Sequence, residues 1–319
     1  MLSLFFENSL KLKDIPRPEP GPGEVLIRVR LAGICRTDLE VTQGYHSFRG
    51  VLGHEFVGEV AGPLDSPLKG RRVVGEINVG CGRCDWCRRG VPGHCPERQA
   101  LGLKGRNGVM APFFTLPAAN LHPVPDEVPD EVAVFTEPLA AALAVGESAP
   151  LGPGARVLVI GDGPLGLLIS WTLALSGAAV HLAGHYSEHL ALAKPYGVIT
   201  YLEKELPGGS YDAVVEASGS PAGLDLALAR VRSRGTVILK STYAAPYLLA
   251  PGSLVVPEVT LVGSRCGPFA AALGLLKSGR LEPRPLIARR QPLERGLEAF
   301  ELAGRPGTLK VLLDLGTPA

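Results

Sequence analysis

The sequence predicts an α/β protein in two parts, an antiparallel β domain and a doubly wound parallel sheet with helices. Short apolar runs separated by proline and glycine turns fill the first part of the chain. From about Pro138, strand-like and helix-like segments alternate instead, which is typical of a parallel sheet. The length of 319 residues agrees with about two domains of roughly 150 residues each.

The individual elements follow from these patterns. Apolar and polar residues alternate over 24–30 and 56–60, and a Pro-Glu-Pro-Gly-Pro-Gly turn at 18–23 precedes the first run. In the second part we expect strands at 156–161, 179–183, 213–217 and 236–240, and helices at 165–175 and 188–194. After Gly263 the pattern reverts to short pieces, with a helix near 269–277 and a last strand at 309–315.

Composition and charge exclude several function classes. With 32 Lys and Arg against 31 Asp and Glu, the net charge of +1 gives no field for gathering nucleic acid or an anionic membrane. The first residues lack the basic start and long apolar stretch of a secretory signal, so we expect a cytoplasmic protein. The uncharged stretch 165–184 is long enough to cross a bilayer. Ser176-Gly177 interrupts it, which instead predicts a buried helix followed by a buried strand.

A glycine-rich turn follows the strand 157–160 and opens an apolar helix. Its sequence is Gly161-Asp162-Gly163-Pro164-Leu165-Gly166. The first glycine permits the turn, the second lets the backbone approach a pyrophosphate, and the third allows close helix–strand packing. The helix N-terminus offers free N–H groups to phosphates. This context predicts a dinucleotide site, with an ordinary βα turn as the alternative.

The end of the second strand of this part bears on the choice of dinucleotide. An acidic residue is expected there to hold the adenosine ribose, but the sequence is Ala183-Gly184-His185-Tyr186-Ser187. Without a carboxylate, the three polar side chains could donate hydrogen bonds to a 2′-phosphate. We therefore hypothesise that NADP is preferred or at least accepted, with Gly184 and His185 near the nucleotide. The alternative is NAD held by backbone groups alone.

Four of the six cysteines crowd into one loop, at Cys81, Cys84, Cys87 and Cys95. Four soft ligands at this spacing match a closed tetrahedral zinc site that stabilises the loop and leaves no position for substrate. A reactive redox pair is the alternative, although it would not need four cysteines.

A second metal site is suggested by residues outside that loop. Cys35, His54 in Gly53-His54-Glu55, and Glu137 before Pro138 would supply a thiolate, an imidazole and a carboxylate. Three such ligands form an open zinc site with room for water or a substrate oxygen. Taken singly, each residue has an ordinary structural explanation.

Together these motifs resemble the zinc-dependent medium-chain alcohol dehydrogenases, in the branch of polyol, threonine and glucose dehydrogenases. The resemblance covers nearly the whole chain and includes Gly263-Ser264-Arg265. It implies a GroES-like β domain from residues 1–137, with a zinc lobe at about 80–96, completed by 266–319. This domain would enclose a Rossmann NAD(P)-binding domain at 138–265, with the active site in the cleft between the two. The resemblance also implies a homodimer or a homotetramer.

The resemblance also implies roles for individual residues. Cys35, His54 and Glu137 would be the catalytic zinc ligands, and Glu55 would lie behind them or act as a transient fourth ligand. Asp38 would orient the ligand histidine, Thr37 would bind the substrate oxygen and pass its proton outward, and Arg36 would reach the cofactor pyrophosphate. In some relatives a histidine completes the proton relay, but Leu39-Glu40 stand there. Glu40 or His46 could replace it, or both could be surface residues.

The activity implied is reversible oxidation of an alcohol, polyol, sugar or hydroxy amino acid to a carbonyl, with two zinc ions per chain and NADP or NAD. Tyr45, His46 and Phe48 precede the His54 motif and could line the substrate pocket or pack the loop under it. Two other functions stay open. One is a zinc-free enone or quinone reductase, which would need neither Cys35 nor His54, and the other is a non-catalytic dinucleotide sensor.

Overall fold

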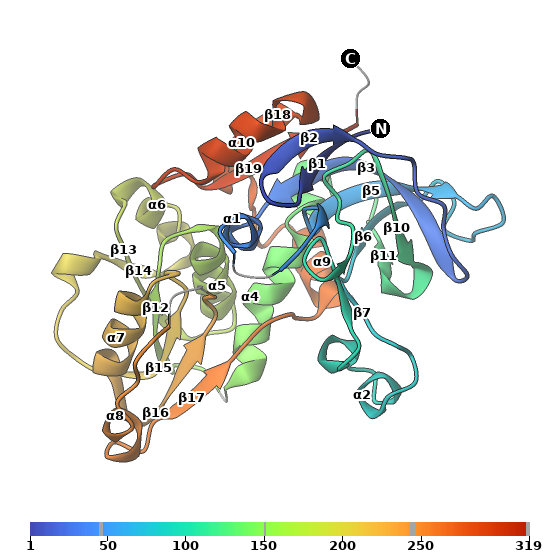
Figure 1. Ribbon diagram of the computed structural model, residues 1–319. Coiled ribbons are helices and arrows are strands. Elements are labelled where there is room, and N and C mark those ends of the chain that lie inside the picture. The colour runs from blue at the N-terminus through green and yellow to red at the C-terminus, as the bar shows by residue number, and fades with distance from the viewer. Residues whose placement is uncertain (45–46, 150, 243–245, 317–319) are drawn as a thin grey trace. The chain divides into compact units, whose positions relative to one another are not determined.

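The computed structural model describes residues 1–44, 47–149, 151–242 and 246–316, and the chain divides into two compact units (Figure 1). Unit 1 consists of Met1–Glu137 and Phe269–Ala319, and unit 2 of Pro138–Pro268. Unit 1 is thus built from both ends of the chain, which returns to it at residue 269 where the sequence suggested 266.

The main sheet of unit 1 has seven strands in the order β11-β6-β5-β3-β19-β18, with β10 paired to β3 off this path. The strands are β3 Glu24–Ile34, β5 Glu55–Gly62, β6 Arg72–Gly75, β10 Phe113–Pro117, β11 Leu121–Pro123, β18 Ile287–Pro292 and β19 Lys310–Asp314. Among the described strands of this sheet, β18 and β19 form the one parallel pair. Strand β19 pairs with the end of β3, with Val311 opposite Ile34, so Lys310 lies next to the Cys35 segment.

The remaining elements of unit 1 are short. A three-stranded sheet contains β1 Leu2–Phe6, β2 Leu10–Asp14 and β4 Gly50–Val51, and a second contains β7 Asn78–Val79, β8 Gln99–Leu101 and β9 Gly105–Arg106. The helices are α1 Arg36–Thr42, α2 Asp85–Arg88, α3 Asp130–Ala133, α9 Phe269–Lys277 and α10 Gly296–Ala303, with 3₁₀ turns η1 Pro92–His94, η2 Ala118–Asn120, η5 Arg284–Leu286 and η6 Leu293–Arg295. Helix α4, Thr136–Ser148, begins in unit 1 and continues into unit 2.

Unit 2 is a six-stranded parallel sheet in the order β14-β13-β12-β15-β16-β17. Its strands are β12 Arg156–Ile160, β13 Ala179–Gly184, β14 Ile199–Leu202, β15 Tyr211–Glu216, β16 Val231–Leu239 and β17 Thr260–Gly263. The helices are α5 Pro164–Leu175, α6 Ser187–Ala191, α7 Pro221–Arg230 and α8 Gly252–Val255, with 3₁₀ turns η3 Lys194–Tyr196 and η4 Glu203–Glu205. The strand order reverses between β12 and β15, and ligands of such sheets bind beyond the carboxyl ends of the strands at this reversal.

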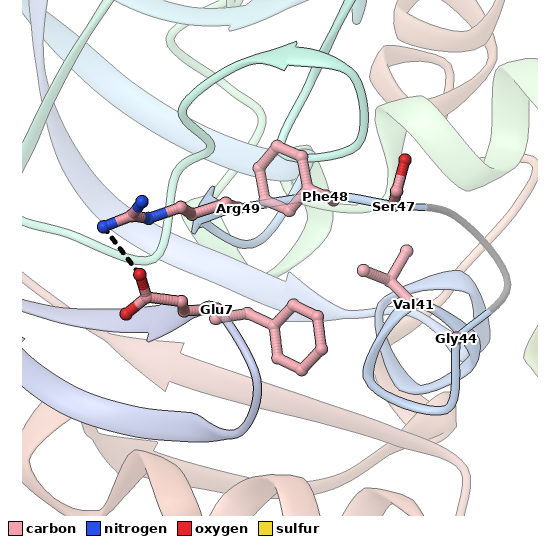
Figure 2. A pocket seen from close by; sticks show the side chains of 7 residues that line it. Glu7, Val41, Gly44, Ser47, Phe48 and Arg49 are labelled. Carbon is pink, nitrogen blue, oxygen red and sulfur yellow. Dashed lines mark ion pairs between the residues drawn. The ribbon is translucent and has the colours of Figure 1, made fainter.

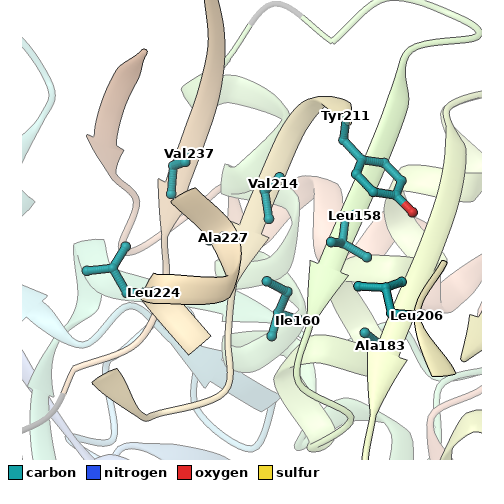
Figure 3. Close-up of a cluster of buried hydrophobic side chains, with 9 residues drawn as sticks. All are labelled: Leu158, Ile160, Ala183, Leu206, Tyr211, Val214, Leu224, Ala227 and Val237. Carbon is teal, nitrogen blue, oxygen red and sulfur yellow. The ribbon is translucent and has the colours of Figure 1, made fainter. Parts of the chain in front are cut away.

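Apolar side chains from both halves of this sheet form the core of unit 2 (Figure 3). Leu158 and Ile160 on β12 and Val214 on β15 are fully buried in it, and Tyr211 packs at its edge with the ring inside. The stretch 165–184 forms α5 and β13, as the sequence predicted. Within the described ranges, the structure has no helix with the length and apolarity needed to span a bilayer.

The predicted elements agree with the structure except in unit 2. The helix expected over 188–194 ends at Ala191, and a 3₁₀ turn follows at Lys194–Tyr196. Pro195 explains the early end, because proline lacks an N–H and disfavours helical geometry in the residue before it. Strands β14 and β17 and helices α7 and α8 of unit 2 were not predicted, and neither were α1 and α10 of unit 1. Strand β14 is only partly buried, so its apolar alternation is weak.

Candidate active site

The cluster Cys35–His54–Glu55 forms where the strands β3 and β5 meet their neighbouring loops. One ligand atom from each residue lies within 4.8 Å of the other two. Cys35 follows β3 directly and is the N-cap of α1, whereas Glu55 is the first residue of β5. The antiparallel register places Gly33 opposite Glu55, which brings the two segments together. A thiolate, an imidazole and a carboxylate at this separation are a donor set that suits zinc.

Close backbone approach positions His54. Gly53 has φ +95°, and a Cβ there would lie 2.6 Å from Met110 Cγ. A Cβ on Gly108 would lie 2.2 Å from the Gly53 carbonyl oxygen, so only glycine allows the segment 108–110 to pass so near. The amide of Val109 then donates to the Gly53 carbonyl at 3.1 Å. The residue before the histidine is thereby fixed on both sides.

Asp38 orients the imidazole of His54. Its side chain is fully buried, and its Oδ2 accepts a hydrogen bond from the Cys35 amide at 2.9 Å. Its Oδ1 lies 3.2 Å from His54 Nδ1, an ion-pair distance without the alignment of a regular hydrogen bond. With Nδ1 facing the carboxylate, Nε2 is the nitrogen available to a metal. Burial alone would lower the pKa of His54, but the Asp38 carboxylate raises it well above the ordinary value, and Cys35 adds to this.

Lys310 neutralises Glu55 from the far end of the chain. Its Nζ donates to Glu55 Oε1 and Oε2, both at 2.7 Å, and to the Ile34 carbonyl at 3.2 Å. Burial lowers the pKa of Lys310, but the charges of Glu55 and Cys35 outweigh burial and raise it. A Cβ on Gly33 would lie 2.1 Å from Glu55 Oε2, so glycine is required opposite this carboxylate. No sequence pattern marks Lys310 as a site residue, and the pairing of β19 with β3 brings it to the cluster.

Glu137 lies in the first turn of α4 and is partly buried. The group of mutually close ligand atoms contains Glu55 and not Glu137 within the described part of the chain. The charge of Glu137 nevertheless reaches the cluster, because it contributes to raising the pKa of Lys310. The structure therefore brings two of the three expected catalytic zinc ligands together and leaves the third nearby.

Helix α1 carries the other predicted residues of this site. The Cys35 thiol donates to Thr37 Oγ1 at 3.8 Å, which places the hydroxyl beside the cluster. Arg36 is exposed, and its Nε donates to Glu40 Oε1 at 2.9 Å. The carboxylate of Glu40 is buried, and its ion pair with Arg36 balances its charge. His46 and Tyr45 lie outside the described residues.

Phe48 lines a pocket of about 500 Å³ between α1 and the β1 end (Figure 2). The wall combines the aromatic ring with Val41 and Gly44 of the α1 segment. An ion pair of 2.6 Å between Arg49 and Glu7 closes one side. Among the described residues that line it, none is a proposed zinc ligand. Nothing identifies this pocket as the substrate pocket, so a role for Phe48 in lining the latter stays a prediction.

The four cysteines of the lobe form a second group, with all four sulfur atoms within 4.8 Å of one another. None of them is in a disulfide in the described chain. The backbone amides of Arg83 and Cys84 lower the pKa of Cys81 to about 6, whereas desolvation raises the pKa of Cys87 to about 11. A Cβ on Gly80 would lie 2.6 Å from Cys87 Sγ, so the loop closes tightly around the sulfurs. This arrangement fits a closed four-thiolate zinc site.

The glycine-rich turn of unit 2 has the geometry that a dinucleotide needs. Gly161 has φ +113°, and a Cβ on Gly166 would lie 1.9 Å from the Gly161 carbonyl oxygen. Gly163 is the N-cap of α5, with Pro164 and Leu165 in the first turn, and nothing lies within 4 Å of where its Cβ would be. Strand and helix are thus packed closely, and open space is left in front of the helix N-terminus for a pyrophosphate.

The turn after β13 contains the last two predicted residues, Gly184 and His185. The His185 side chain is exposed, and its Nε2 lies 3.7 Å from Glu203 Oε2. The backbone amide of His185 donates to Asp162 Oδ2 at 2.8 Å. Asp162 belongs to the glycine-rich turn after β12, so nothing in the sequence that follows β13 indicates this contact.

Comparisons with known proteins agree with this geometry. Residues 21–126 match the family model for the alcohol dehydrogenase GroES-like domain. The chain is 31% identical to an L-threonine 3-dehydrogenase of Pyrococcus horikoshii, with 95% of each chain covered. It is also 31% identical to a D-altritol 5-dehydrogenase of Agrobacterium fabrum, with 94% of this chain and 95% of the relative covered.

Two solved structures have the same fold over nearly the whole chain. One is described as a zinc-binding dehydrogenase of Sinorhizobium meliloti 1021 bound to NADP, with a TM-score of 0.88, 26% identity and 98% of both chains covered. The other is described as a short chain alcohol dehydrogenase of Escherichia coli CFT073 complexed with NADH, with a TM-score of 0.88, 28% identity, and 98% of this chain and 99% of that chain covered. The predicted fold, an α/β protein with GroES-like and Rossmann parts, is confirmed, and so is the predicted enzyme class. The chain belongs to the zinc-containing medium-chain alcohol dehydrogenase family, whose members oxidise alcohols to carbonyls with NAD(P).

Proposed function

We propose that this alcohol dehydrogenase oxidises a polyol or a hydroxy amino acid, with two zinc ions per chain and NAD or NADP as the hydride acceptor. The Cys35–His54–Glu55 cluster carries the proposal, since a zinc-free reductase or a dinucleotide sensor would need no such donor set. The substrate class rests on the relatives, which are named for threonine and altritol oxidation at 31% identity.

Cys35, His54 and Glu137 would hold the zinc at the substrate site. When bound, zinc supplies a Lewis acid for the alcohol oxygen, and the nicotinamide supplies the hydride acceptor. Asp38 keeps the His54 ring in the orientation that presents Nε2, and Lys310 keeps Glu55 charge-balanced behind the ligands. Two of the three ligands, Cys35 and His54, are therefore held close together before any metal binds.

Thr37 would bind the substrate hydroxyl and move its proton. Its Oγ1 already accepts a hydrogen bond from Cys35 at 3.8 Å, so it lies within reach of an oxygen held at the cluster. A threonine hydroxyl can accept the substrate proton while donating its own to the next group. Asp38 and Thr37 thus divide the work between ligand orientation and proton transfer, and Glu55 supports the ligand set.

The other proposed sites serve binding and stability. Gly161, Gly163 and Gly166, with Pro164 and Leu165 in the helix start, would hold the pyrophosphate, and Arg36 stays the further cofactor contact that the family resemblance implies. The four cysteines of the lobe would hold a structural zinc. The family resemblance supports a homodimer or homotetramer.

A turnover screen tests the proposal. Zinc-loaded protein is mixed with primary and secondary alcohols, polyols, aldoses and 3-hydroxy amino acids, each with NAD and with NADP, and the absorbance of the reduced nicotinamide is followed. We expect activity on polyols or 3-hydroxy amino acids. Activity only on simple alcohols would overturn the substrate class, and silence with only one zinc bound would overturn the catalytic site.

A further inference from the structure

The turn at the end of β13 holds a carboxylate that its own sequence lacks. Asp162 belongs to the glycine-rich turn after β12, yet its Oδ2 accepts hydrogen bonds from the His185 amide at 2.8 Å and the Tyr186 amide at 2.7 Å. Its side chain is only 7% exposed. The turn after β12 therefore supplies an acidic side chain to the turn after β13.

The backbone around this carboxylate is shaped to receive it. A Cβ on Gly184 would lie 2.4 Å from Asp162 Cβ and Cγ and 2.5 Å from its Oδ2. Glycine at this position is thus what lets the two turns approach. The Nδ1 of the buried His189 lies 3.9 Å from the same Oδ2. The contact joins the two turns in one fixed arrangement, and its members lie within unit 2.

This arrangement opposes a phosphate on the adenosine ribose. The end of the second strand is where the 2′ position of a dinucleotide lies in this fold. Two backbone amides that could donate to a phosphate are already engaged by Asp162. The segment 183–189 contains no Arg or Lys, and Glu203 lies beside His185. A 2′-phosphate would therefore meet the carboxylates of Asp162 and Glu203, and the segment 183–189 offers no arginine or lysine to balance them.

We propose that Asp162 makes this enzyme select NAD over NADP, replacing the acidic residue that usually ends the second strand. The inference rests on the proposed dinucleotide site at the glycine-rich turn. It reverses the preference hypothesised from the sequence, because that hypothesis considered only the residues that follow β13. Here the selecting charge comes from residue 162, more than 20 positions earlier along the chain.

Nucleotide binding tests the proposal without relying on turnover. NADH and NADPH are titrated by fluorescence into the purified full chain, into Asp162→Asn and into Asp212→Asn. Asp212 is the second residue of β15 and pairs with Arg232, so it controls for the loss of one carboxylate in the same unit. We expect the wild type to bind NADH at least about 10-fold more tightly than NADPH. Asp162→Asn should reduce this ratio about 10-fold, mainly through tighter NADPH binding, and the control should keep it.

The outcomes separate the two proposals. NADPH binding to the wild type as tightly as NADH would overturn the role of Asp162, and so would an unchanged ratio in Asp162→Asn with a wild-type melting curve. If Asp162→Asn does not fold, the ratio of NADPH to NADH affinity in the wild type can still overturn the proposal. Binding of neither nucleotide would instead overturn the proposed dinucleotide site on which the inference rests.

Discussion

Lys310 and Glu55 form a buried ion pair between residues 255 positions apart. Both Glu55 oxygens are bonded to one ammonium group, and both side chains are almost inaccessible. Removing charges from water is costly, and the pair compensates this cost only while both partners are present. The pair therefore matters less as a source of stability than as a condition for placing a carboxylate behind the zinc ligands.

Replacing Lys310 with methionine should leave the Glu55 charge buried and unbalanced. We expect Lys310→Met to lower the free energy of unfolding by about 3–5 kcal/mol, as measured by urea unfolding followed by circular dichroism. Lys277→Met is the matched control, because its ion pair with Glu127 is exposed and should contribute only about 0–1 kcal/mol. A Lys310→Met loss no larger than that of the control would contradict the account. Adding Glu55→Gln to Lys310→Met should recover part of the loss.

Thr37 is predicted to act in proton transfer and not in metal binding. Thr37→Ala should lower kcat about 100-fold while the zinc content stays at the wild-type value, since Thr37 is not one of the proposed zinc ligands and its hydroxyl lies beside the Cys35 sulfur. Thr42→Ala, at the end of the same helix, removes a hydroxyl that donates to the Leu39 carbonyl at 2.7 Å and should leave kcat unchanged. Equal turnover in wild type and Thr37→Ala would remove this residue from the relay.

Residue types and spacing predict the metal ligands of the sites, but they do not predict the charged residues that pack behind them. Cys35, His54 and the lobe cysteines stand out because thiols and imidazoles are uncommon and their spacing is informative. Lys310 and Asp162 carry no such signal. One becomes important through the pairing of β19 with β3, and the other through a hydrogen bond to a turn of a different βα unit.

At the level of elements, the cysteine lobe depends most clearly on a metal. Helix α2 has four residues, and none of them is buried. Hydrophobic burial therefore adds little to its stability, whereas four thiolates around one zinc ion would hold the loop outright.

Cys87→Ser should accordingly release the lobe zinc and expose residues 80–96 to protease. Limited trypsin digestion should cut this segment at Arg83, Arg88 or Arg89 at least about 10-fold faster than in the wild type. Cys266→Ser, outside the lobe, should keep both its zinc content and the wild-type digestion rate. Equal protection of the lobe in Cys87→Ser and wild type would show that the metal does not hold it.

The elements of unit 2 show why some boundaries follow from sequence and others do not. The strongly apolar strands β12 and β15 and the helix α5 are evident, since they are buried on nearly every side. Strand β14 at the sheet edge is half exposed, so no alternation marks it. Helix α7 is capped by Ser220, whose Oγ accepts a hydrogen bond from the Gly223 amide, and Ser220-Pro221 is the local sequence signal for its start.

At the scale of the whole molecule, unit 1 is completed by the last part of the chain. Strand β19 lies between β3 and β18 in the main sheet, so the site residues Cys35 and Lys310 meet although they come from opposite ends. The change of pattern at about 138 predicts a second domain, but only the family resemblance indicated that the chain returns to the first. The order of strands across a sheet is set by contacts that local periodicity does not contain.

The central claim is that the chain holds two separate zinc sites and that only one of them supports oxidation. Zinc content by elemental analysis, measured together with turnover, tests it in wild type, Cys35→Ser and Cys87→Ser. We expect two zinc ions per wild-type chain and one in each variant. Cys35→Ser should lose turnover at least about 1,000-fold while its lobe resists trypsin as the wild type does. Two zinc ions in Cys35→Ser, or wild-type turnover with one, would contradict the account.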